Sequence, residues 1–233
     1  MRPRMVALSP RLLAALSMLN GSRTVADIGS DHGRLAAALL QRGVCERVIA
    51  TDISEPSLKK AEQLIRTIGL MDRVSFRVGD GLRVLAAGEC DAIALLGMGG
   101  TLMCDMLEAV EEPLRGAASA VFQPMRAQSD IREYLYRRGY RITDDRVIAE
   151  RERLYQVFRA IPADTVQALP DGFPAGFFDV GFVSFANRDP NLPALCRLQL
   201  REHETQMKNA KGTVGEAKLA VKIAALQQIL QAY

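Results

Sequence analysis

The sequence has few side chains of the kinds that bind metals. It contains four cysteines and two histidines in 233 residues, and no two cysteines form a C-x-x-C pair. Structural zinc sites are built from cysteine and histidine ligands at such short spacings. We therefore expect no metal, and we expect reduced thiols at Cys45, Cys90, Cys104 and Cys196.

Long apolar runs are also missing. No window approaches the roughly eighteen uninterrupted apolar residues that a membrane-spanning helix requires. Two arginines stand near the N-terminus, but no apolar segment of signal-peptide length follows them. Hydrophobic residues make up 48% of the chain, which is ample for a packed core. We expect a globular cytoplasmic protein without a membrane segment.

A strong net charge is absent, but the small charge is unevenly distributed. The formal net charge is +3, and residues 194–233 carry all of it, with six basic and three acidic side chains. A weakly basic tail is compatible with a polyanionic partner. Its alternative interpretation is an ordinary solvated helix face.

Strands and helices are predicted to alternate along residues 1–162. This alternation is typical of βαβ units, and therefore of a mostly parallel sheet covered on both faces. The last two predicted strands have no helix between them, so at least one strand should run antiparallel. The predicted strands are 24–28, 48–51, 74–78, 92–96, 119–122, 141–149 and 154–161. The predicted helices are a first one capped by Ser9 before Pro10, and then 35–40, 54–65, 101–110 and 130–138.

The composition changes after Pro162, which suggests a second unit over residues 163–233. It begins with a connector rich in Pro, Gly and Phe, whose aromatic side chains should pack on a surface. Two helices are predicted at 195–209 and 216–233, with a turn at Lys211-Gly212-Thr213. A coiled-coil-like spacing in the second helix predicts an antiparallel helical hairpin. The residues of that seam are Leu219, Ile223, Leu226, Leu230 and Tyr233, and they leave open whether the hairpin packs on itself, on the first unit or on a partner.

The most informative motif is Asp27-Ile28-Gly29-Ser30-Asp31-His32-Gly33, between a predicted strand and a predicted helix. Gly29 permits a tight turn and a close approach of backbone to ligand, and Gly33 lets the helix pack against the strand. An acid at the strand end repels phosphate, but Asp27 is able to face the ammonium group of a methionine moiety. The pattern D-x-G-x-x-x-G also differs from the G-x-G-x-x-G of nicotinamide dehydrogenases.

Two more acids follow the next two predicted strands. Asp52 is placed to accept hydrogen bonds from ribose hydroxyls, or else to cap the next helix. Asp80, within Gly79-Asp80-Gly81, is placed to accept from an adenine amino group, or else lies in an ordinary turn. Open α/β sheets bind ligands at the carboxyl ends of their strands, so three acids at that edge predict a nucleoside site.

Two segments after the fourth and fifth predicted strands are candidates for acceptor contacts. Gly97-Met98-Gly99-Gly100 brings backbone close to a flat ring, or forms a flexible loop. In Phe122-Gln123-Pro124-Met125, the amide of Gln123 either positions a base edge or caps the next helix.

These motifs resemble those of the TrmK-type bacterial tRNA adenine-N1 methyltransferases, which modify adenine 22. The resemblance extends over almost the whole chain. It departs where the family has Ala-Tyr-Leu-Pro and Gln-Pro-Asn, because this chain has Gly33-Arg34-Leu35-Ala36 and Gln123-Pro124-Met125. The segments that carry the resemblance are Leu8-Ser9 with Arg11-Leu12, residues 26–32, 79–82 and 97–100, Gln123-Pro124, residues 134–140 and the C-terminal helices.

The resemblance implies a class I methyltransferase fold, S-adenosylmethionine as cofactor and tRNA as substrate. We expect a monomer or a weak homodimer. Asp31 is a candidate to stabilise the cationic product and His32 to position the base, with structural roles as the alternatives. Gln123 completes the catalytic candidates. The cofactor-binding candidates are Asp27, Gly29, Ser30, Gly33, Asp52, Ile53, Gly79, Asp80, Gly81, Gly97, Met98 and Gly99. The substrate-binding candidates are Arg11, Gly100, Pro124, Met125, Arg197, Arg201, Lys208, Lys211 and Lys218, with Arg2, Arg4 and Lys222 as further phosphate contacts.

Two other functions fit the sequence. One is a methyltransferase of the same fold that acts on a small molecule or a protein. The basic tail argues against this alternative, because such a substrate does not need it. A non-catalytic module that binds the cofactor or RNA is suggested by Arg34 and Met125, which replace the residues usual in the family.

Overall fold

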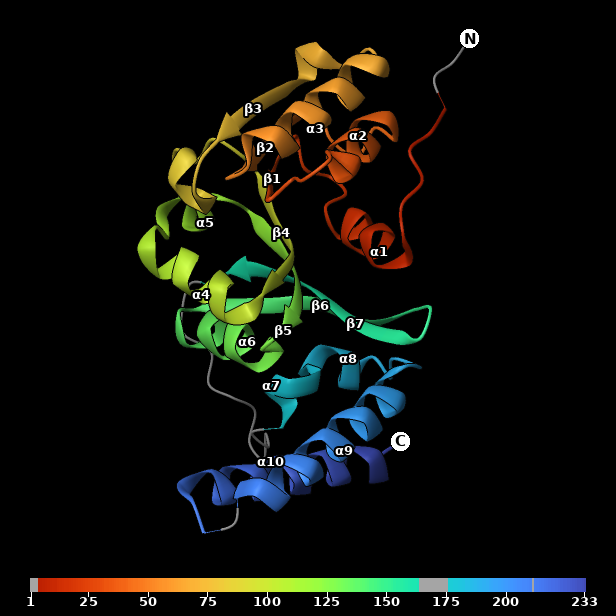
Figure 1. The fold of residues 1–233 in the computed structure, drawn as a ribbon, viewed down its shortest axis with the longest axis vertical. Coiled ribbons are helices and arrows are strands. Elements are labelled where there is room, and N and C mark those ends of the chain that lie inside the picture. Colours follow the sequence, from red (N-terminus) through yellow and green to blue (C-terminus); the bar gives the residue numbers. More distant parts are fainter. Residues whose placement is uncertain (1–3, 164–175, 211) are drawn as a thin grey trace.

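The computed structural model describes residues 4–163, 176–210 and 212–233, and it contains the predicted α/β sheet. The sheet has seven strands in the order β3-β2-β1-β4-β5-β7-β6 (Figure 1). Strand β7 runs antiparallel to both of its neighbours, and the other pairs are parallel. The predicted Rossmann-like fold with one antiparallel strand near the end is therefore confirmed.

The elements lie close to their predicted positions. The strands are β1 Thr24–Ile28, β2 Arg47–Asp52, β3 Val74–Val78, β4 Ala92–Gly99, β5 Ser119–Arg126, β6 Tyr140–Glu150 and β7 Arg153–Pro162. The helices of the sheet region are α1 Pro10–Met18, α2 Arg34–Gln41, α3 Glu55–Thr67, α4 Gly100–Ala109, α5 Glu112–Gly116 and α6 Gln128–Arg137, with short 3-10 turns at Met71–Arg73 and Gly81–Val84. After them come α7 Phe177–Val180, α8 Phe182–Ala186, α9 Leu192–Ala210 and α10 Val214–Gln231.

Two predicted strand ends were wrong. Strand β4 continues through the glycine segment to Gly99, and β5 continues through Gln123 and Pro124 to Arg126. The two strands keep pairing because a register shift beside Gly97 lets them bend together. Strand β7 pairs with β5 only up to Phe122, so it forms no hydrogen bonds with Pro124. Proline is tolerated at this position because no hydrogen bond from its backbone nitrogen to β7 is required. Gln123 is therefore a strand residue and does not cap α6.

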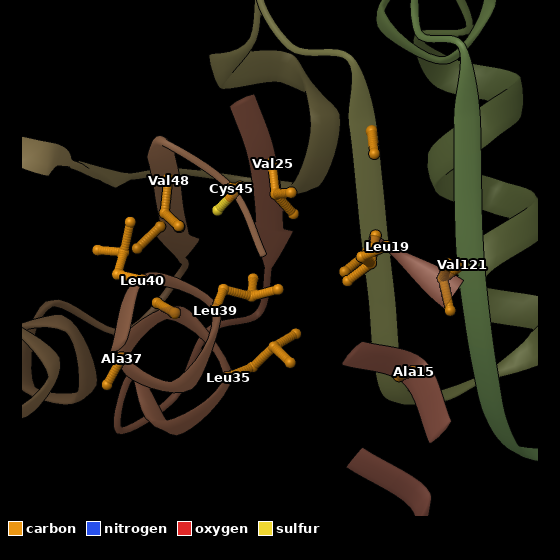
Figure 2. Close-up of a cluster of buried hydrophobic side chains, with 14 of the residues drawn as sticks. Ala15, Leu19, Val25, Leu35, Ala37, Leu39, Leu40, Cys45, Val48 and Val121 are labelled. Atoms are coloured by element: carbon orange, nitrogen blue, oxygen red, sulfur yellow. The ribbon is translucent and has the colours of Figure 1, made fainter. Parts of the chain in front are cut away.

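Alternating side chains along the central strands form two hydrophobic clusters, one on each face of the sheet. Val25 of β1 belongs to the cluster under α1, α2 and α3. Ala26 and Ile28 of the same strand belong to the cluster under α4, α5 and α6. Figure 2 shows the first cluster, in which Leu35 and Leu39 of α2 and Leu19 point toward the strands. Burial on both faces explains why these strands read as continuous apolar runs.

The predicted C-terminal helical hairpin is present, formed by α9 and α10 (Figure 1). Its buried residues include Leu226 and Ile229, which pack against α7, α9 and Val147 of β6. Of the predicted seam, Leu226 is fully buried, whereas Tyr233 is 38% exposed. The hairpin therefore packs on its own chain, at the edge of the sheet beyond β6.

A buried ion pair ties α7 to the sheet. Arg132 of α6 and Asp145 of β6 are both almost fully buried, and two guanidinium N–H groups donate to the carboxylate at 3.1 and 3.0 Å. A further N–H of Arg132 donates to the backbone carbonyl of Phe178 at 3.1 Å. The aromatic connector residues Phe177, Phe182 and Phe185 also pack here, as expected, and Phe173 lies outside the described residues.

Candidate functional site

A cavity of about 850 Å³ opens at the carboxyl ends of the central strands. Strand β1 lies between β2 and β4, so the chain order reverses there. Open α/β sheets bind their ligands at this kind of switch point. The cavity is lined by the start of α1, the β1–α2 turn with the start of α2, the end of β2, the segment after β3, the last residues of β4, part of α4 and one side chain of β5.

Asp27, on β1, places a buried carboxyl group in the cavity wall. It is 4% exposed, and the Ser30 hydroxyl donates a hydrogen bond to it at 2.8 Å. Burial raises the pKa of Asp27 to about 6; the Ser30 bond opposes this rise and the charge of Asp52 adds to it. Within the described residues, no basic side chain forms an ion pair with Asp27. At neutral pH this carboxylate therefore has an unmet preference for a cation.

The β1–α2 turn brings backbone close to the cavity. Gly29 has a φ of +71°, and a Cβ at that position would lie 2.4 Å from the Met98 side chain. Gly33 has a φ of +70°, but a Cβ there would meet Ala61 of α3 at 2.7 Å. Gly33 therefore allows α2 to approach α3, not the strand that the sequence suggested, and it does not line the cavity.

Asp52, at the end of β2, links two neighbouring turns. Its carboxylate accepts from the backbone N–H of Asp31 at 2.9 Å and from that of Ser54 at 2.8 Å. Ser54 is the N-cap of α3, with its hydroxyl oxygen accepting from the Ser57 N–H, so the capping role considered for Asp52 is wrong. Asp80 is exposed and lies 3.5 Å from Arg83.

Among the described residues, two hydroxyl groups of the cavity are buried and have no hydrogen-bond partner. They are Ser9 Oγ, at the start of α1, and Thr51 Oγ1, at the end of β2. Ser9 occupies the predicted N-cap position of α1, with Pro10 as the first helical residue, but its side chain makes no capping hydrogen bond. Buried hydroxyls are nearly always paired, so both point to a polar ligand.

Apolar side chains stand at the mouth of the cavity. Ile53 is 75% exposed and Leu102 is 51% exposed, and both line it together with Met98 and Met106. Large apolar side chains with such exposure offer flat contact surfaces to an aromatic ring. Gly97 has a φ of +77° and has open space where a Cβ would stand.

His32 lies at the rim in a chain of three polar side chains. Its Nδ1 is 2.9 Å from Asp31, and its Nε2 is 3.2 Å from the Lys60 ammonium. An ammonium group has no acceptor, so Nε2 accepts and Nδ1–H donates to Asp31. Asp31 itself has a φ of +50°, which is uncommon for a residue other than glycine.

The wall opposite the acids carries Gln123, which is 1% exposed. Its Oε1 accepts from Arg11 Nη1 at 3.3 Å. Its Nε2 donates to the Pro124 carbonyl at 3.2 Å and contacts the Met125 sulfur at 3.4 Å. Arg11 also pairs with Glu150, with 3.7 Å between Nε and the carboxylate.

The structure gathers most of the predicted site residues in the cavity wall. Those that line it are Arg11, Asp27, Gly29, Ser30, Asp31, His32, Asp52, Ile53, Gly79, Asp80, Gly81, Gly97, Met98 and Gln123. Gly33, Gly99, Gly100, Pro124 and Met125 are adjacent but outside the lining. A Cβ at Gly100 would lie 2.0 Å from the Ala127 carbonyl oxygen, so this glycine lets α4 pack against the chain before α6.

The basic candidates of the hairpin lie away from the cavity. Arg197, Arg201, Lys208 and Lys218 are exposed on α9 and α10, whereas Lys222 is half-buried and bound to Asp179 at 2.9 Å. Arg4 is exposed before α1, and Arg2 and Lys211 lie outside the described residues. Several lining residues were not predicted as site residues, because they lie outside the acid and glycine motifs: Ser9, Leu12, Arg34, Thr51, Leu96, Leu102 and Met106.

Among the described residues, no three His, Cys, Asp or Glu side chains are arranged to hold a metal ion. None of the described helices combines the length and the hydropathy needed to cross a membrane.

Residues 8–158 match the profile of a family described as methyltransferase domain. The chain is also 34% identical over 157 residues to the tRNA (adenine(22)-N(1))-methyltransferase of Bacillus subtilis (strain 168). That alignment covers 67% of this chain and 66% of the length of the relative.

Solved structures extend the similarity to the C-terminal helices. The crystal structure of the B. subtilis M1A22 tRNA methyltransferase TrmK matches with a TM-score of 0.85 and 28% identity, covering 97% of this chain and 99% of the other. A putative tRNA (m1A22) methyltransferase of Streptococcus pneumoniae, solved in complex with S-adenosyl-L-methionine, matches with a TM-score of 0.84 and 22% identity. It covers 96% of this chain and 100% of that chain, and at this identity it supports the fold alone.

Proposed function

This chain belongs to the methyltransferase domain family, and we propose that it transfers a methyl group from S-adenosylmethionine to N1 of adenine 22 in tRNA. The observation that carries the proposal is the buried Asp27 carboxylate, without a basic partner among the described residues, at the switch point of the sheet. Such a group suits a ligand with a cationic amino-acid end. The B. subtilis relative supports the choice of acceptor.

The residues present fit the methyl donor. Asp27 would hold its ammonium group. The buried hydroxyls of Ser9 and Thr51, which have no hydrogen-bond partner among the described residues, would make further polar contacts with the donor. Asp52 keeps a further lone pair on each oxygen for the ribose hydroxyls. Ile53 would lie against the face of the donor's adenine. When bound, this cofactor supplies a sulfonium-activated methyl group.

The acceptor chemistry needs little proton transfer from the protein. Adenine N1 has a free lone pair, so no general base has to act first. The ring becomes cationic on methylation, and a carboxylate nearby would stabilise the charge as it develops. Asp31 is our candidate, with His32 held against it by Lys60 in one tautomer. The remaining contribution is alignment of the two reactants.

The C-terminal unit would hold the RNA. N1 lies on the Watson–Crick edge, so a paired or stacked adenine must be drawn out before it reaches the cavity. We assign the cofactor to residues 1–162 and the grip on the RNA backbone mainly to residues 163–233. The exposed cations on the hairpin are Arg197, Arg201, Lys208 and Lys218.

The hairpin assignment gives a quantitative prediction. Replacing those four cations by glutamine should lower tRNA affinity and make the slope of log affinity against log salt shallower by about two to four. Cofactor affinity should stay within twofold, and glutamine at Arg42, an exposed residue at the end of α2, is the matched control. An unchanged salt slope would contradict the assignment.

The function is tested by label transfer from S-adenosylmethionine to bulk unmodified tRNA, followed by nucleoside digestion and mass analysis. We expect 1-methyladenosine, and we expect Asp27→Asn to abolish it. If the protein binds S-adenosylhomocysteine in calorimetry but modifies no tRNA, the proposal is wrong. The cavity would then serve another acceptor, or a module that binds the cofactor without turnover.

A further inference from the structure

Arg11, at the edge of the cavity, contacts other residues on three sides. Its guanidinium lies over the ring of Tyr155, with 4.9 Å to the centroid. One Glu150 oxygen lies 3.7 Å from Nε and also accepts from the Arg11 backbone N–H at 3.2 Å. Nη1 donates to Gln123 Oε1 at 3.3 Å and is 3.5 Å from the sulfur of Met125. Arginine suits such a site because its donors point in fixed directions.

These contacts permit a single orientation of the Gln123 amide. A guanidinium only donates hydrogen bonds, and the Pro124 carbonyl only accepts them. Turning the amide over would place NH2 against Arg11 and oxygen against the Pro124 carbonyl, and both hydrogen bonds would be lost. In the described part of the chain, Arg11 is the one residue that donates to Oε1. The oxygen therefore keeps a second lone pair while the amide lines the cavity.

We propose that Arg11 is a positioning residue that presents the Gln123 carbonyl oxygen to the 6-amino group of the target base. This inference rests on the proposed function. Adenine carries an amino donor beside N1, whereas a 6-oxo purine carries an acceptor there. An amide held with its oxygen available selects the first and repels the second. Arg11, considered from the sequence as a phosphate contact, instead acts through Gln123.

Glu150 has a defined part in this arrangement. The methylated base is a cation, so an unpaired guanidinium in the same wall would oppose its formation. The Glu150 carboxylate offsets the Arg11 charge and leaves the Gln123 contact in place. Lysine at position 11 would keep the charge, but its single ammonium cannot reproduce contacts to Glu150, Gln123 and Tyr155 together.

The experiment compares two tRNA transcripts with the full-length protein. One carries adenosine at the target position, and the other carries purine riboside, which keeps the N1 lone pair and lacks the 6-amino group. We expect single-turnover rates to favour adenosine by about tenfold or more in the wild type. The ratio should fall to the same lower value in R11M and Q123M, set by the intrinsic difference in N1 reactivity between the two bases, with no further fall in the double variant. R11K should lie between the wild type and R11M.

Two measurements separate this role from others. The affinity for S-adenosylhomocysteine should change less than twofold in R11M, as in the exposed control R42M. In nitrogen-15 NMR spectra, the side-chain NH2 signals of Gln123, assigned by their loss in Q123M, should move in R11M and stay in place in R42M.

Several outcomes would overturn the proposal. An adenosine preference as large in R11M as in the wild type, or losses that add in the double variant, would mean that Arg11 does not act through Gln123. A tenfold loss of S-adenosylhomocysteine affinity would mean that it holds the cofactor. A wild type that makes no 1-methyladenosine refutes the proposed function and with it base selection. The NMR signals of Gln123 still test whether Arg11 positions this amide, because that measurement is made without tRNA.

Discussion

Replacing Asp27 by asparagine should make the protein more stable and less able to bind its cofactor. Burial raises the pKa of this carboxyl from 3.8 to about 6. At neutral pH, a shift of that size means that the ionised carboxylate lowers the free energy of unfolding by roughly 3 kcal/mol. Asparagine removes that cost and still accepts the Ser30 hydrogen bond, but its buried NH2 group gains no evident partner, at a cost of about 1 kcal/mol. The net gain should be about 2 kcal/mol.

The pH dependence has a definite sign. The pKa of Asp27 is higher in the folded protein than in the unfolded chain, so the cost is fully present above pH 6. Between about pH 6 and 4 the folded protein takes up the proton first, and below that range both states are neutral. The advantage of Asp27→Asn should therefore be largest near pH 7.5 and should disappear as the pH approaches 4.

Urea unfolding at pH 7.5, 6.0 and 4.5 measures this difference. Burial raises the pKa of Asp145 to about 6 as well, even beside Arg132, but both proteins contain that group and it cancels. Exposed Asp72→Asn is the matched control and should change the unfolding free energy little at any pH. At pH 7.5, calorimetry should also show at least a tenfold loss of S-adenosylhomocysteine affinity. A variant less stable than wild type at pH 7.5, or an advantage that does not depend on pH, would refute the reasoning.

Three further substitutions test separate parts of the structure. Asp52→Asn leaves one of two backbone N–H groups without its acceptor, and calorimetry should show S-adenosylhomocysteine affinity falling at least tenfold. Gly33→Ala places a methyl group 2.7 Å from Ala61 at a φ of +70°, so urea unfolding should show a loss of about 1–3 kcal/mol. Arg132→Met leaves Asp145 buried and unpaired and should cost about 3–5 kcal/mol by the same assay, with much of the loss recovered when Asp145 is replaced by Leu.

The strands, the mostly parallel sheet and its ligand-binding edge could be predicted because they depend on local sequence pattern. Each central strand is an apolar run ended by an acid or a glycine, and parallel pairing then brings those ends together. Asp27 and Asp52 were found in this way, although they are 25 positions apart in the sequence. The contacts of the strand ends could not be predicted, because β4 and β5 continue past their apolar runs only by pairing with each other.

Specific side-chain contacts between distant elements could not be predicted. Arg11 and Glu150 are separated by 139 positions, and no motif links them. Their approach depends on how α1 packs over β6 and β7, which is a property of the whole core. The burial of Asp27 is of the same kind, because the sequence places the acid but only the packed structure removes water from it.

The distribution of charge gives the two parts of the proposed function, methyl transfer and binding of the RNA backbone, different electrostatic surroundings. A cationic methyl donor and a cationic methylated base both favour a negative site, and Asp27 and Asp52 supply it. The guanidinium of Arg11 would oppose this if it were unpaired, but Glu150 offsets its charge. A polyanionic RNA, by contrast, needs cations that must not lie beside the reacting atoms. The exposed cations of the hairpin, which we propose for this role, lie at the edge of the sheet beyond β6 (Figure 1), so phosphate binding and methyl transfer need not compete for one electrostatic field.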